Sequence, residues 1–236
     1  MHPYGQTRSA WQRDHLLQTP DTFVRARLPG MRAATAIVHA APAMGAKFTQ
    51  YTAEFEPGGT LASAATQRFV YVLEGALSIG DATLHPGDYA WMPPDFPAAP
   101  HAIGTAKAAI IEKPYVALKG ADCPQFFHGS ESAITPTLLA NDPWLQVHSL
   151  IPADPAFDLA VNIMTFQPGA TLPMVEIHVM EHGLLMLQGH GIYRLGDCWY
   201  PVAAGDFIWM APYLPQWFGA LGKTPARYLI YKDWNR

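Results

Sequence analysis

Short apolar and aromatic runs, separated by turn-forming residues, recur along the whole chain. Residues 69–73 read Phe-Val-Tyr-Val-Leu and precede Gly75, while residues 184–187 read Leu-Leu-Met-Leu and precede Gly189. Short apolar runs that end at glycine, often with aromatic and β-branched residues, are typical of β-strands. The pattern therefore predicts a series of short strands joined by tight turns.

The chain also repeats itself. Four pairs of segments match in the same order: residues 55–58 with 166–169, 73–75 with 187–189, 87–94 with 205–212, and 108–113 with 228–232. In the strongest pair, Gly-Asp-Tyr-Ala-Trp-Met-Pro-Pro recurs as Gly-Asp-Phe-Ile-Trp-Met-Ala-Pro. Four ordered matches indicate two copies of one structural unit.

We therefore predict an all-β fold of two double-stranded β-helix (jelly-roll) barrels in tandem, because closure of antiparallel strands into barrels removes exposed sheet edges. The N-terminal barrel is expected to span residues 1–128 and the C-terminal barrel residues 129–236. The poorly periodic stretch 116–143 is interpreted as the connection, with one short helix near residues 130–140.

Composition and charge narrow the class of protein. The 19 glycines, the 22 prolines and a hydrophobic fraction of 50% suit many turns around a sizeable core. A net charge of −4 without blocks of like charge argues against nucleic acid or a membrane as a partner. The polar residues 1–18 do not resemble a signal peptide, and Cys123 and Cys198 are expected to stay reduced. We therefore expect a cytoplasmic protein.

The second repeat carries a spaced set of polar residues and glycines. It reads Gly-x6-Glu-x-His-x3-His-x6-Gly, and a second segment ends in glutamine eleven residues after its glycine; the residues are Gly169, Glu176, His178, His182, Gly189, Gly205 and Gln216. This arrangement is similar to the two sequence motifs of the cupin superfamily. Cupins usually carry His-x-His, then Glu, then His at the four ligand positions, so this chain keeps the spacing but permutes the ligands.

These four side chains suit a metal ion. In a regular strand, Glu176, His178 and His182 would share the face that points into the barrel. A carboxylate and two imidazoles are costly to bury unpaired, and a divalent cation removes that cost. With Gln216 as the fourth ligand, two imidazoles and two oxygen donors favour Mn²⁺ or Fe²⁺. The alternative is a set of hydrogen-bonded core histidines, which the motif spacing disfavours.

The first repeat is an internal control. The same spacing leads to Ala62, Ala64, Arg68 and Ala98, so no ligand remains at any of the four positions. We expect the first barrel to be metal-free and either structural or buried against a partner. Three histidines of this half, His85, His101 and His128, are expected at turns or on the surface.

Several segments of the second half resemble the (S)-ureidoglycine aminohydrolase family, which consists of bicupins of purine catabolism. The resemblance is carried by residues 175–183, 188–193, 215–217 and 227–233. It is strong over most of residues 155–236 and looser in the N-terminal half. It implies that Glu176, His178, His182 and Gln216 bind Mn²⁺, with Fe²⁺ or another divalent metal as an alternative, and that Glu176, Gln216, Tyr228 and Lys232 contact a small-molecule substrate.

The resemblance also implies a reaction, the replacement of the α-amino group of (S)-ureidoglycine by hydroxyl, which yields (S)-ureidoglycolate and ammonia. Tyr228 and Lys232 would share one face of a strand, where a phenol and an ammonium suit a substrate carboxylate. We expect Lys232 and Glu176 to be catalytic, with Glu176 as the general acid and base. Glu181, on the other face, is expected to be structural.

Two other functions stay open at this point. One is a different metal-dependent cupin enzyme, such as a dioxygenase or an isomerase. The other is a non-catalytic small-molecule-binding bicupin, although such proteins tend to lose their ligands in both halves. Apolar segments at residues 199–200 and 217–218 could pack against another subunit, so we expect a homo-oligomer.

Overall fold

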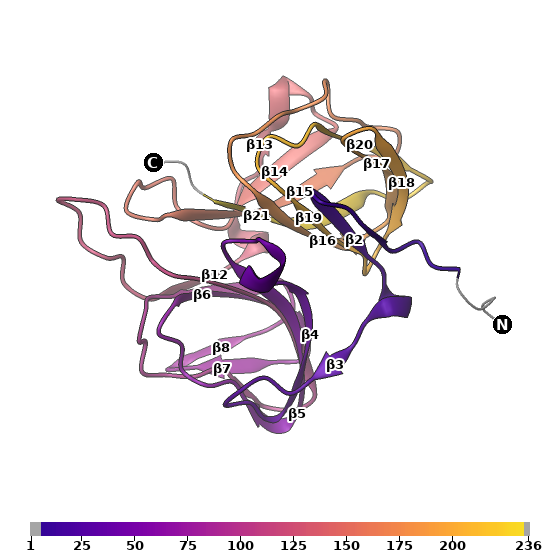
Figure 1. The fold of residues 1–236 in the computed structure, drawn as a ribbon. Helices are drawn as coiled ribbons and strands as arrows, with labels where there is room; N and C mark the ends of the chain where they lie inside the picture. Colours follow the sequence, from indigo (N-terminus) through magenta and orange to yellow (C-terminus); the bar gives the residue numbers. More distant parts are fainter. Residues whose placement is uncertain (1–5, 234–236) are drawn as a thin grey trace. The chain divides into compact units, whose positions relative to one another are not determined.

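The computed structural model describes residues 6–233 and divides into two units (Figure 1). The N-terminal barrel unit comprises residues 24–134 and 150–158. The C-terminal barrel unit comprises residues 135–149 and 159–233 together with residues 6–23. Residues 1–5 and 234–236, at the outer ends of the two predicted domains, lie outside the described residues. This division differs from the two continuous domains predicted, 1–128 and 129–236. Residues 6–23 belong to the C-terminal unit, whereas residues 129–134 and 150–158 belong to the N-terminal unit.

The N-terminal barrel unit is built from antiparallel strands. They are β3 (Arg25–Ala26), β4 (Arg32–Ala40), β5 (Thr49–Thr60), β6 (Gln67–Glu74), β7 (Leu77–Ile79), β8 (Ala82–Leu84), β9 (Asp88–Met92), β10 (His101–Ala102), β11 (Ala106–Lys113) and β12 (Phe127–Ser130). The strand order is β12-β9-β6-β11-β5-β10-β7-β8, with β4 also paired to β5 and β3 to β4. Alternate residues of β5, such as Tyr51, Ala53 and Phe55, enter the apolar core of this unit, as the period of two in a strand requires.

The C-terminal barrel unit contains an eight-stranded and a three-stranded antiparallel sheet. Its strands are β1 (Ala10–Trp11), β2 (His15–Gln18), β13 (Thr137–Leu138), β14 (Leu145–Ser149), β15 (Leu159–Phe166), β16 (His182–Gln188), β17 (His190–Leu195), β18 (Cys198–Ala203), β19 (Phe207–Met210), β20 (Gln216–Leu221) and β21 (Ala226–Asp233). The larger sheet has the order β1-β2-β19-β16-β21-β15-β14-β13, and the smaller one β18-β17-β20. Aromatic residues from both sheets, among them Phe166, Phe218 and Tyr228, meet in one core.

The helical elements of residues 6–233 are four short 3-10 turns. They are η1 (Pro20–Thr22), η2 (Pro42–Met44), η3 (Glu131–Ala133) and η4 (Leu139–Asn141). The prediction of one short helix near residues 130–140 is therefore wrong, because η3, β13 and the start of η4 occupy that stretch. No helix in the described part of the chain is long and apolar enough to cross a membrane.

The glycines of the sequence repeat occupy equivalent turns in the two barrels. Gly75 and Gly189 both have φ of +73°, a conformation that side chains other than hydrogen rarely tolerate. A Cβ atom at Gly75 would lie 2.2 Å from the Thr105 carbonyl oxygen, and one at Gly189 would lie 2.5 Å from that of Pro225. The same close approach of two chain segments explains why both copies end the central strand with glycine.

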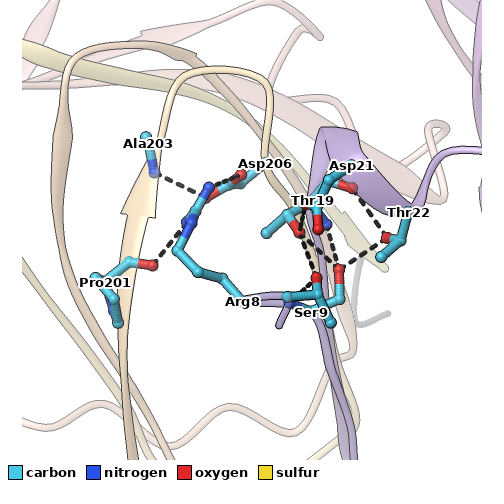
Figure 2. Close-up of polar contacts among 9 residues, drawn as sticks. Arg8, Ser9, Thr19, Asp21, Thr22, Pro201, Ala203 and Asp206 are labelled. Atoms are coloured by element: carbon cyan, nitrogen blue, oxygen red, sulfur yellow. Dashed lines mark hydrogen bonds and ion pairs between the residues drawn. The ribbon is translucent and has the colours of Figure 1, made fainter. Parts of the chain in front are cut away.

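A polar network fastens the N-terminal segment to the C-terminal barrel (Figure 2). Arg8 donates from both terminal nitrogens to the carboxylate of buried Asp206, at 2.6 and 2.9 Å, and also to the Pro201 carbonyl at 2.9 Å. The backbone N–H of Ala203 donates to the same carboxylate at 2.8 Å. Strand β2 pairs with β19 beside this network, so residues 6–23 complete the larger sheet of the barrel.

Candidate metal centre

One cavity of about 170 Å³ in the C-terminal barrel brings the predicted site residues together. All six predicted site residues line it: Glu176, His178, His182, Gln216, Tyr228 and Lys232. Two further polar residues that the sequence analysis did not single out, Asn162 and Tyr193, line it as well. Its apolar lining includes Met164, Leu172, Met180 and Ile230. A polar patch within an otherwise apolar cavity is typical of a small-molecule site.

The strands of the two sheets supply most of the polar residues. His182 and Gln216 are the first residues of β16 and β20, and Tyr228 and Lys232 lie four residues apart on β21. Tyr228, Ile230 and Lys232 all line the cavity. The expectation that Tyr228 and Lys232 share one face of a strand is therefore confirmed.

Glu176 and His178 reach the cavity in a different way from the one predicted. The segment between β15 and β16 is irregular, and Met174, which strand alternation would have turned inward, is 66% exposed. Instead, the backbone of Glu176 exchanges two hydrogen bonds with Gln216, at 2.8 and 2.9 Å. The His178 carbonyl accepts a third hydrogen bond from the Tyr213 N–H at 2.7 Å. Pairing with the smaller sheet, rather than regular strand geometry, directs these two side chains.

The imidazole of His182 has the state that a metal ligand needs. Its Nδ1 lies 3.3 Å from the Tyr231 carbonyl oxygen, and its Nε2 is buried without a hydrogen-bond partner. Donation from Nδ1 leaves the lone pair on Nε2. Burial, together with the charges of His178 and Lys232, lowers the pKa of His182 to about 3. The ring is therefore neutral at physiological pH and can accept a cation.

The other donors are near but not fully converged. His178 Nε2 and a carboxylate oxygen of Glu176 lie 3.1 Å apart, and the rings of His178 and His182 have centroids 5.1 Å apart. Gln216 Oε1 accepts a hydrogen bond from the Tyr193 hydroxyl at 2.9 Å. Within residues 6–233, no three His, Cys, Asp or Glu side chains form a cluster tight enough to hold a metal ion without adjustment.

The chemistry of the donors nevertheless fits a divalent cation. The buried lone pair of His182, a second imidazole and a carboxylate oxygen border one cavity. The amide oxygen of Gln216 faces the same space and is oriented by Tyr193. A cation there has to replace the hydrogen bond between His178 and Glu176, and it would satisfy the unpartnered Nε2 atom.

Two further groups give the cavity its charge and its hydrogen-bond donors. Burial lowers the pKa of Lys232, and the nearby Glu176 carboxylate opposes that shift. Burial, together with Tyr193 and Glu176, raises the pKa of Tyr228 well above its ordinary value. Tyr228 therefore stays protonated and can donate a hydrogen bond to an anionic ligand.

The N-terminal barrel has a different arrangement at the same place. Arg68 pairs across the strands with Glu112 and Met92, just as His182 pairs with Lys232 and Met210. Arg68 is buried, donates to Glu112 at 2.7 Å and donates to the Ala62 carbonyl at 2.8 Å. A guanidinium paired with a carboxylate thus occupies the position that corresponds to His182, the predicted ligand.

The structure also places Glu181 and three histidines of the first half as expected. Glu181 is buried and accepts a hydrogen bond from the Trp209 indole at 3.1 Å, which is a structural role. His85, His101 and His128 are exposed. Asn162 and Tyr193 escaped the sequence analysis because no motif spacing marks them.

Comparison with known proteins identifies relatives of this chain. The cupin domain family matches residues 162–231. The (S)-ureidoglycine aminohydrolase of Arabidopsis thaliana is 39% identical over 239 residues, which cover 98% of this chain and 80% of that protein. A crystal structure from Pseudomonas aeruginosa is 30% identical with a TM-score of 0.89, covering 100% of this chain and 94% of that one.

A more distant structure shares the fold alone. An oxalate decarboxylase of Bacillus subtilis is 11% identical with a TM-score of 0.73, covering 98% of this chain and 80% of that chain. The predicted all-β bicupin fold is therefore confirmed. From the identity over nearly its whole length and from the cupin match, this chain belongs to the (S)-ureidoglycine aminohydrolase family of cupin enzymes.

Proposed function

We propose that this protein hydrolyses (S)-ureidoglycine to (S)-ureidoglycolate and ammonia, as an enzyme of purine and allantoin breakdown. The name of the Arabidopsis relative supports the substrate. The observation that carries the proposal is the cavity in which Lys232 and Tyr228 face Glu176 and the unpartnered Nε2 of His182. Such a site combines an ammonium, a phenol and a set of metal donors, which suits a small carboxylate that also carries an amine.

Glu176, His178, His182 and Gln216 would hold the metal, and the N-terminal barrel would stay metal-free. Two imidazoles with two oxygen donors favour Mn²⁺, with Fe²⁺ or another divalent ion as the alternative. When bound, the cation supplies a fixed anchor for the amine and carboxylate of the substrate, and so selects the face that is presented to water.

Lys232 and Tyr228 bind the substrate carboxylate in this proposal. The ammonium contributes a charge-assisted hydrogen bond and the phenol a second donor. A carboxylate beside Lys232 favours its charged form and so offsets the effect of burial on that group. Met164, Leu172 and Met180 form an apolar part of the cavity wall, and a substrate that displaces water from this wall would strengthen these polar contacts.

The reaction breaks the bond from the α-carbon to the amino nitrogen and forms a bond to the oxygen of water. The lone pair of the ureido nitrogen assists departure of the amine, and water then adds to the imine-like carbon. The leaving amine needs one proton, and the attacking water gives one up. Glu176 can carry that proton between them with a carboxylate oxygen, so the group ends the cycle in its starting state.

The central test is release of ammonia from freshly generated ureidoglycine, measured with and without Mn²⁺ and corrected for spontaneous breakdown. We expect release to require the metal, and His182→Ala to abolish both metal retention and activity. Oxygen consumption with another substrate would favour a dioxygenase. Small-molecule binding without turnover would favour a binding protein. Either result would contradict the proposal.

We also propose that the enzyme is cytoplasmic and forms a homo-oligomer. Trp199 is exposed and its ring lies 5.7 Å from that of Trp217, and Met174 and Ile177 are exposed on the segment that carries Glu176. Exposed aromatic and methionine side chains are common in subunit interfaces. Sedimentation of the purified protein tests this point, and a monomer at micromolar concentration would contradict it.

A further inference from the structure

Lys232 needs a partner that holds its ammonium in place. Its flexible four-carbon stem loses much rotamer freedom when the charge is held at one point. The neighbouring strand β15 places one polar side chain, Asn162, in the same cavity. Asn162 is buried and lies directly opposite Ile230, two residues from Lys232.

The hydrogen bonds of the Asn162 amide point to this role. Its nitrogen can donate to the Val161 carbonyl at 3.0 Å when its oxygen accepts from the Lys232 ammonium at 3.3 Å. The opposite orientation would set the amide oxygen against a carbonyl and the amide nitrogen against an ammonium, so the neighbours select the first one. Asn162 thus presents an acceptor to the group that faces the substrate.

The N-terminal barrel contains an equivalent side-chain hydrogen bond between different residues. Tyr51 lies opposite Ile110 on the strand that corresponds to β15, just as Asn162 lies opposite Ile230. Two residues beyond Ile110 is Glu112, which accepts a hydrogen bond from the Tyr51 hydroxyl at 2.8 Å. In both barrels, the side chain at the position of Asn162 hydrogen-bonds to a polar residue of the neighbouring strand, which is β11 in the first barrel and β21 in the second. The pairing does not depend on metal ligands, since the first barrel has none at the motif positions.

We propose that Asn162 is a positioning residue, which acts through Lys232 by directing its ammonium towards the substrate carboxylate. The inference rests on the proposed function, because it assigns Lys232 to the binding of that carboxylate. Asn162 belongs to neither cupin motif, so its effect should be separable from metal retention.

A double-mutant cycle tests the inference. Asn162→Ala should raise KM for ureidoglycine about tenfold with a smaller change in kcat, because binding common to the ground state and the transition state is lost. Bound Mn²⁺ should stay unchanged. In a Lys232→Met background, the same substitution should have no further effect, because the group it positions is gone. The matched control is Tyr51→Phe, which removes the equivalent contact in the first barrel and should leave KM, kcat and metal content unchanged.

Two results would overturn the inference. One is an unchanged KM in Asn162→Ala. The other is that Asn162→Ala lowers activity by the same factor in the Lys232→Met background as in the unsubstituted enzyme. A crystal structure of Asn162→Ala provides a readout that needs no turnover. The Lys232 side chain should be displaced or spread over several rotamers relative to the unsubstituted enzyme, and an unmoved side chain counts against positioning. If the unsubstituted enzyme does not hydrolyse ureidoglycine, the proposed function fails, while the crystallographic comparison still decides whether Asn162 holds Lys232.

Discussion

His182 is expected to make the metal-free protein less stable than leucine would at the same position. Its side chain is 2% exposed, and Nε2 is buried without a hydrogen-bond partner. A buried polar atom left unpaired costs about 1–3 kcal/mol. His182→Leu removes that cost, keeps a similar volume and gives up the hydrogen bond from Nδ1 to the Tyr231 carbonyl, which contributes about 1 kcal/mol. The expected net gain is about 1 kcal/mol, or a rise in Tm of about 2–4 °C.

Metal should reverse this order. Thermal unfolding of chelator-treated protein should show a higher Tm for His182→Leu than for the unsubstituted protein. At a Mn²⁺ concentration about 100 times Kd, the unsubstituted protein should gain about 2.7 kcal/mol, whereas the variant should gain little. The exposed His85 supplies a control, since His85→Leu should change stability by less than about 0.5 kcal/mol in both conditions. A metal-free His182→Leu that is less stable than the parent, or a variant that gains as much from Mn²⁺, would refute the reasoning about the Nε2 atom.

Three further outcomes follow from the structure. Glu176→Gln should lower kcat about 100-fold or more while metal analysis still finds Mn²⁺; full turnover with bound metal would assign the proton transfer to another group. Asp206→Ala should lower the free energy of unfolding in urea by about 2–3 kcal/mol, because the Ala203 N–H and the Arg8 guanidinium lose their acceptor; an unchanged value would show that the network in Figure 2 adds no stability. Burial lowers the pKa of His39 to about 3. Between about pH 3 and its ordinary pKa of about 6.5, His39 is therefore protonated in the unfolded state but neutral in the folded state. Stability should therefore fall below pH 6.5 by up to about 1.4 kcal/mol per pH unit, and His39→Gln should flatten this slope in unfolding curves at pH 7 and pH 5.

The repeat and the metal motif could be read from the sequence because they depend on local rules. Gly75 and Gly189 mark turns with positive φ at the ends of equivalent strands, and only glycine fits there. The alternation of β21 brought Tyr228 and Lys232 to one face, since side chains in a regular strand repeat every two residues. The spacing of Glu176, His178 and His182 predicted that they share one cavity, because a short segment of seven residues carries all three side chains.

Tertiary structure decided what depends on partners far away in the chain. The segment that carries Glu176 and His178 is directed by pairing with Gln216, forty residues later. Met174 is therefore exposed, although regular strand alternation would turn it inward together with Glu176. Residues 6–23 join the C-terminal barrel because β2 pairs with β19 and Arg8 binds Asp206. No local sequence pattern predicts either contact. Asn162 became a candidate only when β15 lay beside β21, because hydrogen bonds between strands depend on register, and register is a property of the folded sheet.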